Sequence, residues 1–189
     1  MGKIVISENV TLDGVVQDPS GDEGFEHGGW VGHINDRPAV AKAALDDALG
    51  AQALLFGRGG YEFFAARWPS RSGELADRLN SLPKYVVSST LEDPDWNNST
   101  VLKGDVVEEV SKLKREVDEE IVVIGSIQLA RTLIRHDLAD ELRLTVFPIA
   151  LGTGERLFEG ISDQKRLRLV GAESGDDVAF LTYEPVRAA

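Results

Sequence analysis

Short apolar runs alternate with amphipathic patterns along most of the chain. The first run, at 4–7, is rich in β-branched residues, and similar runs recur at 53–56, 85–88 and 121–124. Between them, apolar residues are spaced by three and four, most clearly over 106–117, where charged residues fill the opposite face. Strands that alternate with helices in this way are typical of an α/β domain built on a largely parallel sheet.

Capping residues, glycines and prolines mark the limits of the predicted helices. The first helix is expected to begin at Asn35 or Asp36, just before Pro38, and to end at Gly50. The predicted helices cover 36–49, 60–68, 74–82, 106–117 and 126–134. The long segment 13–36, which precedes the first of them, is irregular and contains Gly, Asp and aromatic residues, so we expect it to form a pocket wall.

The C-terminal third has a different pattern, with alternating strands and no helix. Alternation at 142–146 predicts one strand, and the segments at 167–169 and 178–183 predict two more, joined by a short polar turn at 174–177. Strands joined by so short a turn pair antiparallel. The sequence therefore predicts a single α/β domain over 1–189, with a mixed, mostly parallel central sheet, antiparallel C-terminal strands and flanking helices.

Composition and charge narrow the classes of function. The formal net charge is −12, from 32 acidic and 20 basic residues, which repels the phosphates of nucleic acids and anionic lipids. No apolar run approaches the roughly 18 residues of a membrane span, and the N-terminus lacks a secretory pattern. The absence of cysteine excludes thiolate nucleophiles and cysteine-ligated metals and fits a reducing compartment. We expect a cytoplasmic protein that binds neither nucleic acid nor membrane.

Two predicted strands end in glycines at the point where a helix begins. The segments are LLFGRGGYE at 54–62 and IVVIGSIQL at 121–129. Small residues and free backbone N–H groups at a helix N-terminus suit a phosphate, and two such turns suit a diphosphate. Arg58 can pair with a further phosphate. Neither segment has the GxGxxG or GxxxxGK[ST] spacing of the common nucleotide-binding motifs.

Taken together, these and other segments resemble the dihydrofolate-reductase-like family, in the branch of the C-terminal reductase domain of the riboflavin-biosynthesis deaminase/reductase. The resemblance covers essentially the whole chain. It is carried by TLDGVV at 11–16, GFEHGGW at 24–30, FGRGGYE at 56–62, KYVVSST at 84–90, IGSIQLARTLI at 124–134 and DELRLTVFPIALGTGERLF at 140–158.

The resemblance implies that NADPH lies across the carboxyl ends of the central strands, with its pyrophosphate between the turns at Gly57 and Gly125. The implied cofactor-binding residues are Gly57, Arg58, Gly59, Gly60, Tyr61, Ser88, Ser89, Thr90, Gly125, Ser126, Ile127, Gln128 and Leu129. Hydride transfer is the chemistry of such a cofactor, and the protein supplies alignment and exclusion of water.

The resemblance also implies a small heterocyclic substrate, a pyrimidine ribityl or pterin-like compound, beside the TLDG loop. The catalytic candidate is Asp13, and the candidate substrate-binding residues are Gly14, Phe25, Trp30 and Phe147. Relatives of this type form two-fold homodimers through the C-terminal strands, where this chain is rich in apolar residues.

Three departures from the family pattern separate this chain from folate reductases. Gly60 stands where relatives carry a hydroxyl residue, and Ile127 stands in place of the last glycine of a triplet. Ala41 occupies the position of the carboxylate that binds a pterin, while Asp46 and Asp47 lie further along the helix. The alanine disfavours folate as the substrate. Gly60 and Ile127 keep a second hypothesis open, namely a non-catalytic dimeric nucleotide- or ligand-binding protein on the same fold.

Several candidate residues have two interpretations on the sequence alone. Asp13 either relays a proton or forms an Asp-Gly turn. Phe25 and Trp30 either line a flat substrate or belong to a lid that packs on the core. His27 and His33 do not have the spacing of metal ligands, so no metal site is predicted.

Overall fold

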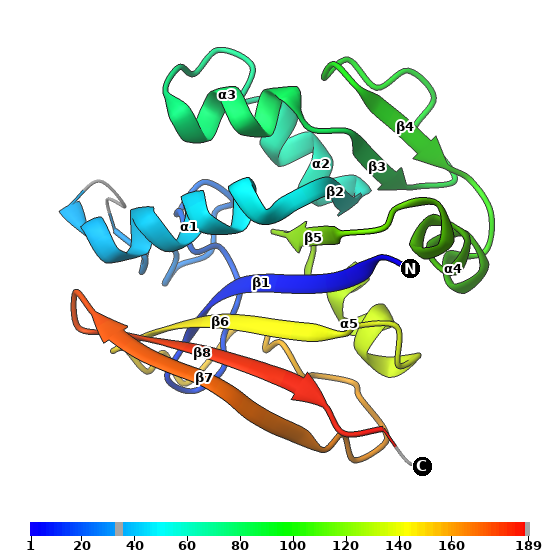
Figure 1. The fold of residues 1–189 in the computed structure, drawn as a ribbon. Helices are drawn as coiled ribbons and strands as arrows, with labels where there is room; N and C mark the ends of the chain where they lie inside the picture. The colour runs from blue at the N-terminus through cyan, green and yellow to red at the C-terminus, as the bar shows by residue number, and fades with distance from the viewer. Residues whose placement is uncertain (33–35, 188–189) are drawn as a thin grey trace.

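The computed structural model describes residues 1–32 and 36–187 (Figure 1). The strands in this part of the chain are β1 (Lys3–Thr11), β2 (Ala51–Gly57), β3 (Lys84–Val87), β4 (Ser99–Leu102), β5 (Glu120–Ile124), β6 (Glu141–Phe147), β7 (Leu167–Gly175) and β8 (Val178–Pro185). The helices are α1 (Pro38–Gly50), α2 (Arg58–Ala65), α3 (Glu74–Ser81), α4 (Val106–Glu116) and α5 (Ile127–Arg135).

All eight strands belong to one mixed sheet, in the order β4-β3-β2-β5-β1-β6-β8-β7. The six strands from β4 to β6 run parallel, and β8 joins β6 and β7 in antiparallel register. The predicted fold class is therefore confirmed. Because the first six strands point the same way, their carboxyl ends and the turns that follow them gather along one edge of the sheet.

Helices cover both faces of the parallel part of the sheet. Ile4 and Ile6 of β1 face a core cluster shared with α4 and α5, whereas Val5 faces a second cluster shared with α1 and α3. The continuous apolar runs of the central strands follow from this double covering. Figure 1 shows α1, α2 and α3 together on one side of these strands, with α4 and α5 apart from them.

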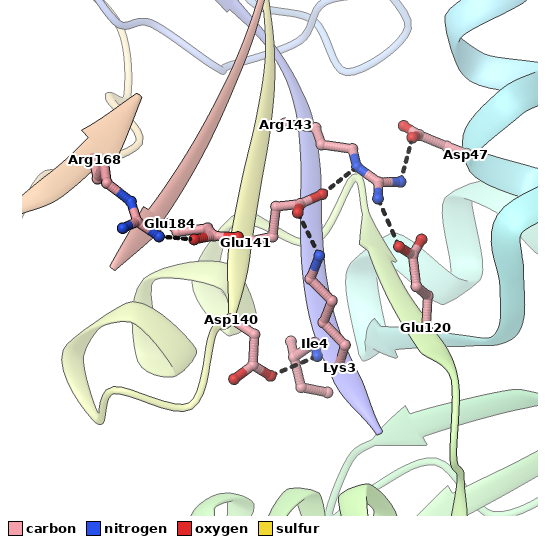
Figure 2. Close-up of polar contacts among 9 residues, drawn as sticks. All are labelled: Lys3, Ile4, Asp47, Glu120, Asp140, Glu141, Arg143, Arg168 and Glu184. Atoms are coloured by element: carbon pink, nitrogen blue, oxygen red, sulfur yellow. Dashed lines mark hydrogen bonds and ion pairs between the residues drawn. The ribbon is translucent and has the colours of Figure 1, made fainter. Parts of the chain in front are cut away.

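Charged residues, as well as apolar ones, hold α1 on the sheet (Figure 2). Arg143 of β6 donates hydrogen bonds to Asp47 of α1 at 2.8 Å, to Glu120 of β5 at 2.8 Å and to Glu141 at 2.6 Å. Lys3 of β1 binds the second oxygen of Glu141 at 2.5 Å. Burial alone raises the pKa of Glu141, but Lys3 and Arg143 hold it below its usual value. We call these five residues the Arg143 cluster.

The structure extends or shifts several elements that the sequence predicts. β4 is missing from the prediction because its four residues, STVL, carry no alternation and follow a turn-rich segment. β1 continues four residues beyond Ser7, through polar Glu8 and Asn9. The residue before α1 is Arg37, which makes no side-chain cap, and α2 begins at Arg58 rather than Gly60. Asn35 and His33 lie outside the described residues.

Candidate active site at the carboxyl edge

The two glycine turns predicted from the sequence lie side by side. β5 is hydrogen-bonded between β2 and β1, so the turn after β5 is next to the turn after β2. The backbone N–H of Gly57 donates to Oγ of Ser126 at 3.2 Å, which joins the two turns directly. The sheet order therefore brings together two segments that are 69 residues apart in the chain.

Close packing between the turns explains two of the small residues. A Cβ at Gly60 would lie 2.2 Å from Oγ of Ser126 and 2.6 Å from the carbonyl oxygen of Gly125. No side chain fits at position 60, and the Ser126 hydroxyl occupies that space instead. Gly125 has φ +54°, and a Cβ there would lie 2.8 Å from the ring of Phe64. Glycine is thus required at position 125 by conformation and by space.

The helices that follow these turns begin without side-chain caps. Neither Gly57, before α2, nor Ser126, before α5, makes a side-chain cap hydrogen bond within the described chain. The Ser126 hydroxyl, an ordinary capping group, is committed to Gly57. The first N–H groups of both helices are therefore available to an external acceptor. The space beside Gly59 is open, since a Cβ built there would have no atom within 4 Å. Two uncapped helix N-termini in contact suit an anion with two charged groups.

A third group of polar side chains lies beside them, at the ends of β2 and β3. Nη1 of Arg58 donates to Oγ1 of Thr90 at 2.7 Å, and its Nε pairs with Glu62 at 2.7 Å. Oγ of Ser88 accepts from the backbone N–H of Thr90 at 3.2 Å and of Leu91 at 3.0 Å. This arrangement holds Arg58 at the carboxyl edge with its guanidinium half exposed, where it can meet a phosphate.

Lys103 is a residue of this region that sequence reasoning missed. Val87 pairs with Leu102 in the β3–β4 register, and the Ser88 N–H donates to the carbonyl of Leu102 at 3.1 Å. The residue after Leu102 is exposed Lys103, which therefore follows the neighbouring strand end. Only knowledge of β4 could have placed it there.

The remaining predicted cofactor residues are placed in different surroundings. Ile127 packs against the core cluster shared with α5, so its side chain does not crowd the turn. Tyr61 is 2% exposed, and its hydroxyl accepts the N–H of Trp96, so contact with a cofactor is left to its backbone. Leu129 is buried, while Ser89 and Gln128 are exposed at the edge. Binding of a cofactor by this set stays a prediction.

Asp13 shapes the loop that follows β1. Its Oδ1 accepts from Thr11 at 2.6 Å and from the N–H of Leu151 at 3.1 Å, and its Oδ2 accepts from the N–H of Gly152 at 2.8 Å. The Thr11 hydroxyl and these backbone donors lower the pKa of Asp13 to about 2. A carboxyl that stays ionised near neutral pH is poorly suited to deliver a proton. The geometry favours the turn interpretation, and the proton-relay role stays a prediction.

The candidate substrate residues lie in a folded loop beside Asp13. Trp30 and Phe147 pack edge to face with centroids 5.5 Å apart, and they are 9% and 1% exposed. Phe25 is half-buried, next to Gly154. Gly14, with φ +82°, would meet nothing within 4 Å even with a Cβ. Trp30 therefore belongs to a lid that packs on Phe147 of β6 in a small core, whereas Phe25 and Gly14 retain accessible surface.

Buried Asp18 organises this lid, another role that the sequence did not indicate. The carboxylate of Asp18 accepts the N–H groups of Glu23 and Phe25, each at 3.1 Å. Asp22 reaches Arg67, beyond the end of α2, in an ion pair of 3.5 Å. The lid is thus tied to the segment that follows α2.

Glu8 is the third residue that was missed, and the one closest to the glycine turns. It is 8% exposed on β1, and its Oε1 accepts the N–H of Ser126 at 3.4 Å. Burial raises the pKa of Glu8 to about 8, against the backbone donors, which lower it. The sequence feature that could have identified Glu8 is its position two residues after Ile6, which places it on the inward face of β1.

The described residues contain neither a cluster of metal-ligand side chains nor a membrane-spanning helix. Within 1–32 and 36–187, no group of three or more His, Asp or Glu side chains could hold a metal ion. In the same part of the chain, no helix has the length and apolarity needed to cross a bilayer.

Comparison with known proteins gives a family match over nearly the whole chain. An uncharacterised protein of Bacillus subtilis, YyaP, is 28% identical over 177 residues, or 91% of this chain and 88% of YyaP. A proposed riboflavin biosynthesis protein from Shewanella sp. PV-4 has a similar fold, with TM-score 0.75, 21% identity and coverage of 98% and 99% of the two chains.

A Thermotoga maritima diaminohydroxyphosphoribosylaminopyrimidine deaminase/5-amino-6-(5-phosphoribosylamino)uracil reductase also shares the fold, with TM-score 0.65 and 18% identity, over 98% of this chain and 57% of that protein. Residues 2–181 match the model of the RibD C-terminal domain. The suspected branch is thereby confirmed, and the chain belongs to the RibD C-terminal domain family, a family of reductases.

Proposed function

We propose that this protein is an NADPH-dependent reductase of a small heterocyclic compound. The observation that carries the proposal is the direct contact between two uncapped helix N-termini, at Gly57 and Ser126, beside Arg58. The two helix N-termini suit a diphosphate, and an arginine beside the strand end suits the additional phosphate of NADPH. Membership of a reductase family supports the same function.

The residues present fit this cofactor. The N-terminal turns of α2 and α5 would hold the pyrophosphate, and Arg58 with Ser88, Ser89 and Thr90 would hold the adenosine side. When bound, the cofactor supplies a hydride. The chain contributes orientation through these contacts, and the lid over Phe147 excludes water from the carboxyl edge.

The carboxylates of α1 favour a pyrimidine over a pterin as the substrate. Asp46 pairs with Lys42, and Asp47 binds Arg143 at 2.8 Å and the Ser7 hydroxyl at 2.6 Å. Asp47 is therefore committed to the fold, Asp46 is an exposed surface residue, and position 41 is alanine. Of the two substrate classes expected from the sequence, a pyrimidine ribityl compound agrees better with this helix.

Titration with NADPH tests the proposed function. We expect binding at micromolar cofactor to quench the fluorescence of the three tryptophans, with energy transfer to the bound nicotinamide. Oxidation of the bound cofactor on addition of candidate pyrimidines, followed by its absorbance, then tests turnover. A protein that binds no NADPH at millimolar concentration would contradict the proposal and favour the non-catalytic ligand-binding alternative. If NADPH binds but is not oxidised with any of the pyrimidines, the assignment of the cofactor site stands and the proposed reductase activity is contradicted.

We also propose that the protein forms a homodimer through its C-terminal strands. β7 is an edge strand, and its Leu169 and Val170 are 51% and 46% exposed. An exposed apolar edge is commonly covered by a second copy. Sedimentation at micromolar protein is expected to give twice the 20.6 kDa chain mass. A charged substitution, Val170→Glu, should shift the boundary to the monomer, and a wild-type protein that remains monomeric up to about 100 µM would disprove the dimer.

A further inference from the structure

Glu8 places a carboxyl group directly beneath the turn that begins α5. Its side chain is 8% exposed and points to the same face of β1 as Ile4 and Ile6. Its Oε1 accepts the N–H of Ser126 at 3.4 Å, and the neighbouring N–H of Gly125 also lowers the pKa of the carboxyl group. A buried carboxyl thus accepts a backbone N–H of the turn assigned to the cofactor.

Among residues 1–32 and 36–187, the surroundings of Glu8 offer no charge that would balance an ionised carboxylate. Charged side chains of the elements around it are committed elsewhere: Lys3 of β1, Glu120 of β5, Glu141 and Arg143 of β6, Arg58 and Glu62 of α2, and Arg131 and Arg135 of α5. The charged residues of the three strands belong to the Arg143 cluster, on the opposite face of the sheet. Arg58 and Glu62 of α2 pair with each other, and the two arginines of α5 bind the segment 155–160. Burial accordingly keeps the Glu8 carboxyl protonated at neutral pH, with a pKa of about 8.

We propose that Glu8 controls anion affinity at the α5 turn: as a neutral acid it steadies the turn, and as a carboxylate it repels a phosphate bound there. The proposal rests on the proposed function, since it concerns the same site. The neutral group contributes a hydrogen-bond acceptor without a charge. Ionisation adds a negative charge at the N–H of Ser126, next to the first N–H groups of α5 that would hold the diphosphate, in surroundings where screening by water is weak.

The direction of the pH dependence follows from linkage. A bound anion opposes ionisation of Glu8 and so raises the pKa of Glu8 further. At a pH where Glu8 is ionised in the free protein, binding of the anion is therefore accompanied by uptake of a proton. Affinity is therefore highest below the pKa of free Glu8 and falls above it. The phosphates of NADPH do not contribute to this change, because their last ionisation is complete near pH 7.

The experiment compares NADPH and inorganic pyrophosphate binding at pH 7.0 and 9.5 in the wild type and in Glu8→Gln, which retains the shape and removes the charge. We expect wild-type affinity for NADPH to fall about tenfold between these pH values, and that of Glu8→Gln to fall less than about threefold. Pyrophosphate loses its own last proton in this range, so its affinity is compared between the two proteins at each pH, and the ratio of wild type to Glu8→Gln should fall as it does for NADPH. Lys84 also titrates here, because burial lowers its pKa to about 8. It is unchanged in Glu8→Gln, so a fall common to both proteins belongs to Lys84 or other groups.

Proton uptake by the wild type gives a second readout that does not depend on the variant folding. At pH 8.5, calorimetry in buffers of different ionisation enthalpy should detect uptake of a fraction of a proton per NADPH bound, and none for Glu8→Gln. Equal pH dependence in both proteins, or no proton uptake by the wild type, overturns the role of Glu8 while leaving the cofactor site intact. Absence of NADPH binding at pH 7.0 overturns the proposed function; if pyrophosphate fails to bind as well, the Glu8 proposal falls with it.

Discussion

Replacing Arg58 with alanine is expected to weaken NADPH binding by about ten- to a hundredfold and to change NADH binding by less than about threefold. The two cofactors differ only in the phosphate on the adenosine ribose, and a charge-assisted hydrogen bond to that phosphate is lost with the guanidinium. Arg58 is half exposed, and its present partners, Glu62 and Thr90, are exposed as well. Folding should therefore be little affected.

Arg168→Ala is a matched control for this measurement. Arg168 is also an exposed arginine paired with a glutamate, Glu184, but it lies on β7 at the far edge of the sheet. Dissociation constants for both cofactors, measured by fluorescence, should be unchanged in this variant. Should Arg58→Ala weaken NADH and NADPH equally, Arg58 does not contact the phosphate that distinguishes them.

Replacing Arg143 with methionine is expected to destabilise the fold by about 3 kcal/mol. The guanidinium alone joins Asp47, Glu120 and Glu141, and Figure 2 shows these carboxylates converging on it from three elements. Without it, three partly buried carboxylates face one another with only Lys3 as a counter-charge. Methionine retains most of the length and apolar volume, so the loss reports the charge rather than a cavity. Chemical denaturation at pH 7 measures it.

The pH dependence of this loss provides an internal check. The pKa of Glu141 is lowered in the folded protein, so its contribution to stability is present above its unfolded value, near 4.5, and is lost as pH falls through the folded value. The difference between wild type and Arg143→Met should narrow in acid. Arg168→Met, which breaks an exposed pair, should cost less than about 1 kcal/mol. A similar loss in both variants would show that the cluster contributes no more than a surface ion pair.

The fold could be predicted from the sequence wherever burial imposes a pattern. β5 is apolar from Ile121 to Ile124 because helices cover both of its faces, and the β7–β8 hairpin is indicated by alternation at 167–169 and by its polar turn. β4 and the second half of β1 could not be predicted, for opposite reasons. β4 is short and partly exposed, so its residues carry no pattern, whereas β1 carries a polar residue, Glu8, at an inward position.

The candidate site could be predicted only as far as backbone chemistry determines it. Glycine at the ends of β2 and β5 indicated the two turns, because little else permits close approach at a helix N-terminus. The hydrogen-bond partners of the side chains could not be predicted, because they are distant in the chain. Asp13 binds the N–H groups of Leu151 and Gly152, and Asp47 binds Arg143. Sequence spacing identifies which groups are available, and tertiary contacts decide which remain free.

The contact between Gly60 and Ser126 restricts how this chain can diverge. The Ser126 hydroxyl and the Gly125 carbonyl lie where a side chain at position 60 would begin. A threonine at position 60 therefore does not fit while serine remains at 126. A hydroxyl side chain could occupy position 60 only if the hydroxyl at 126 were lost and the backbone of the turn shifted. The two positions are therefore coupled, and a chimera that combines a side chain at 60 with serine at 126 should fail to assemble the site.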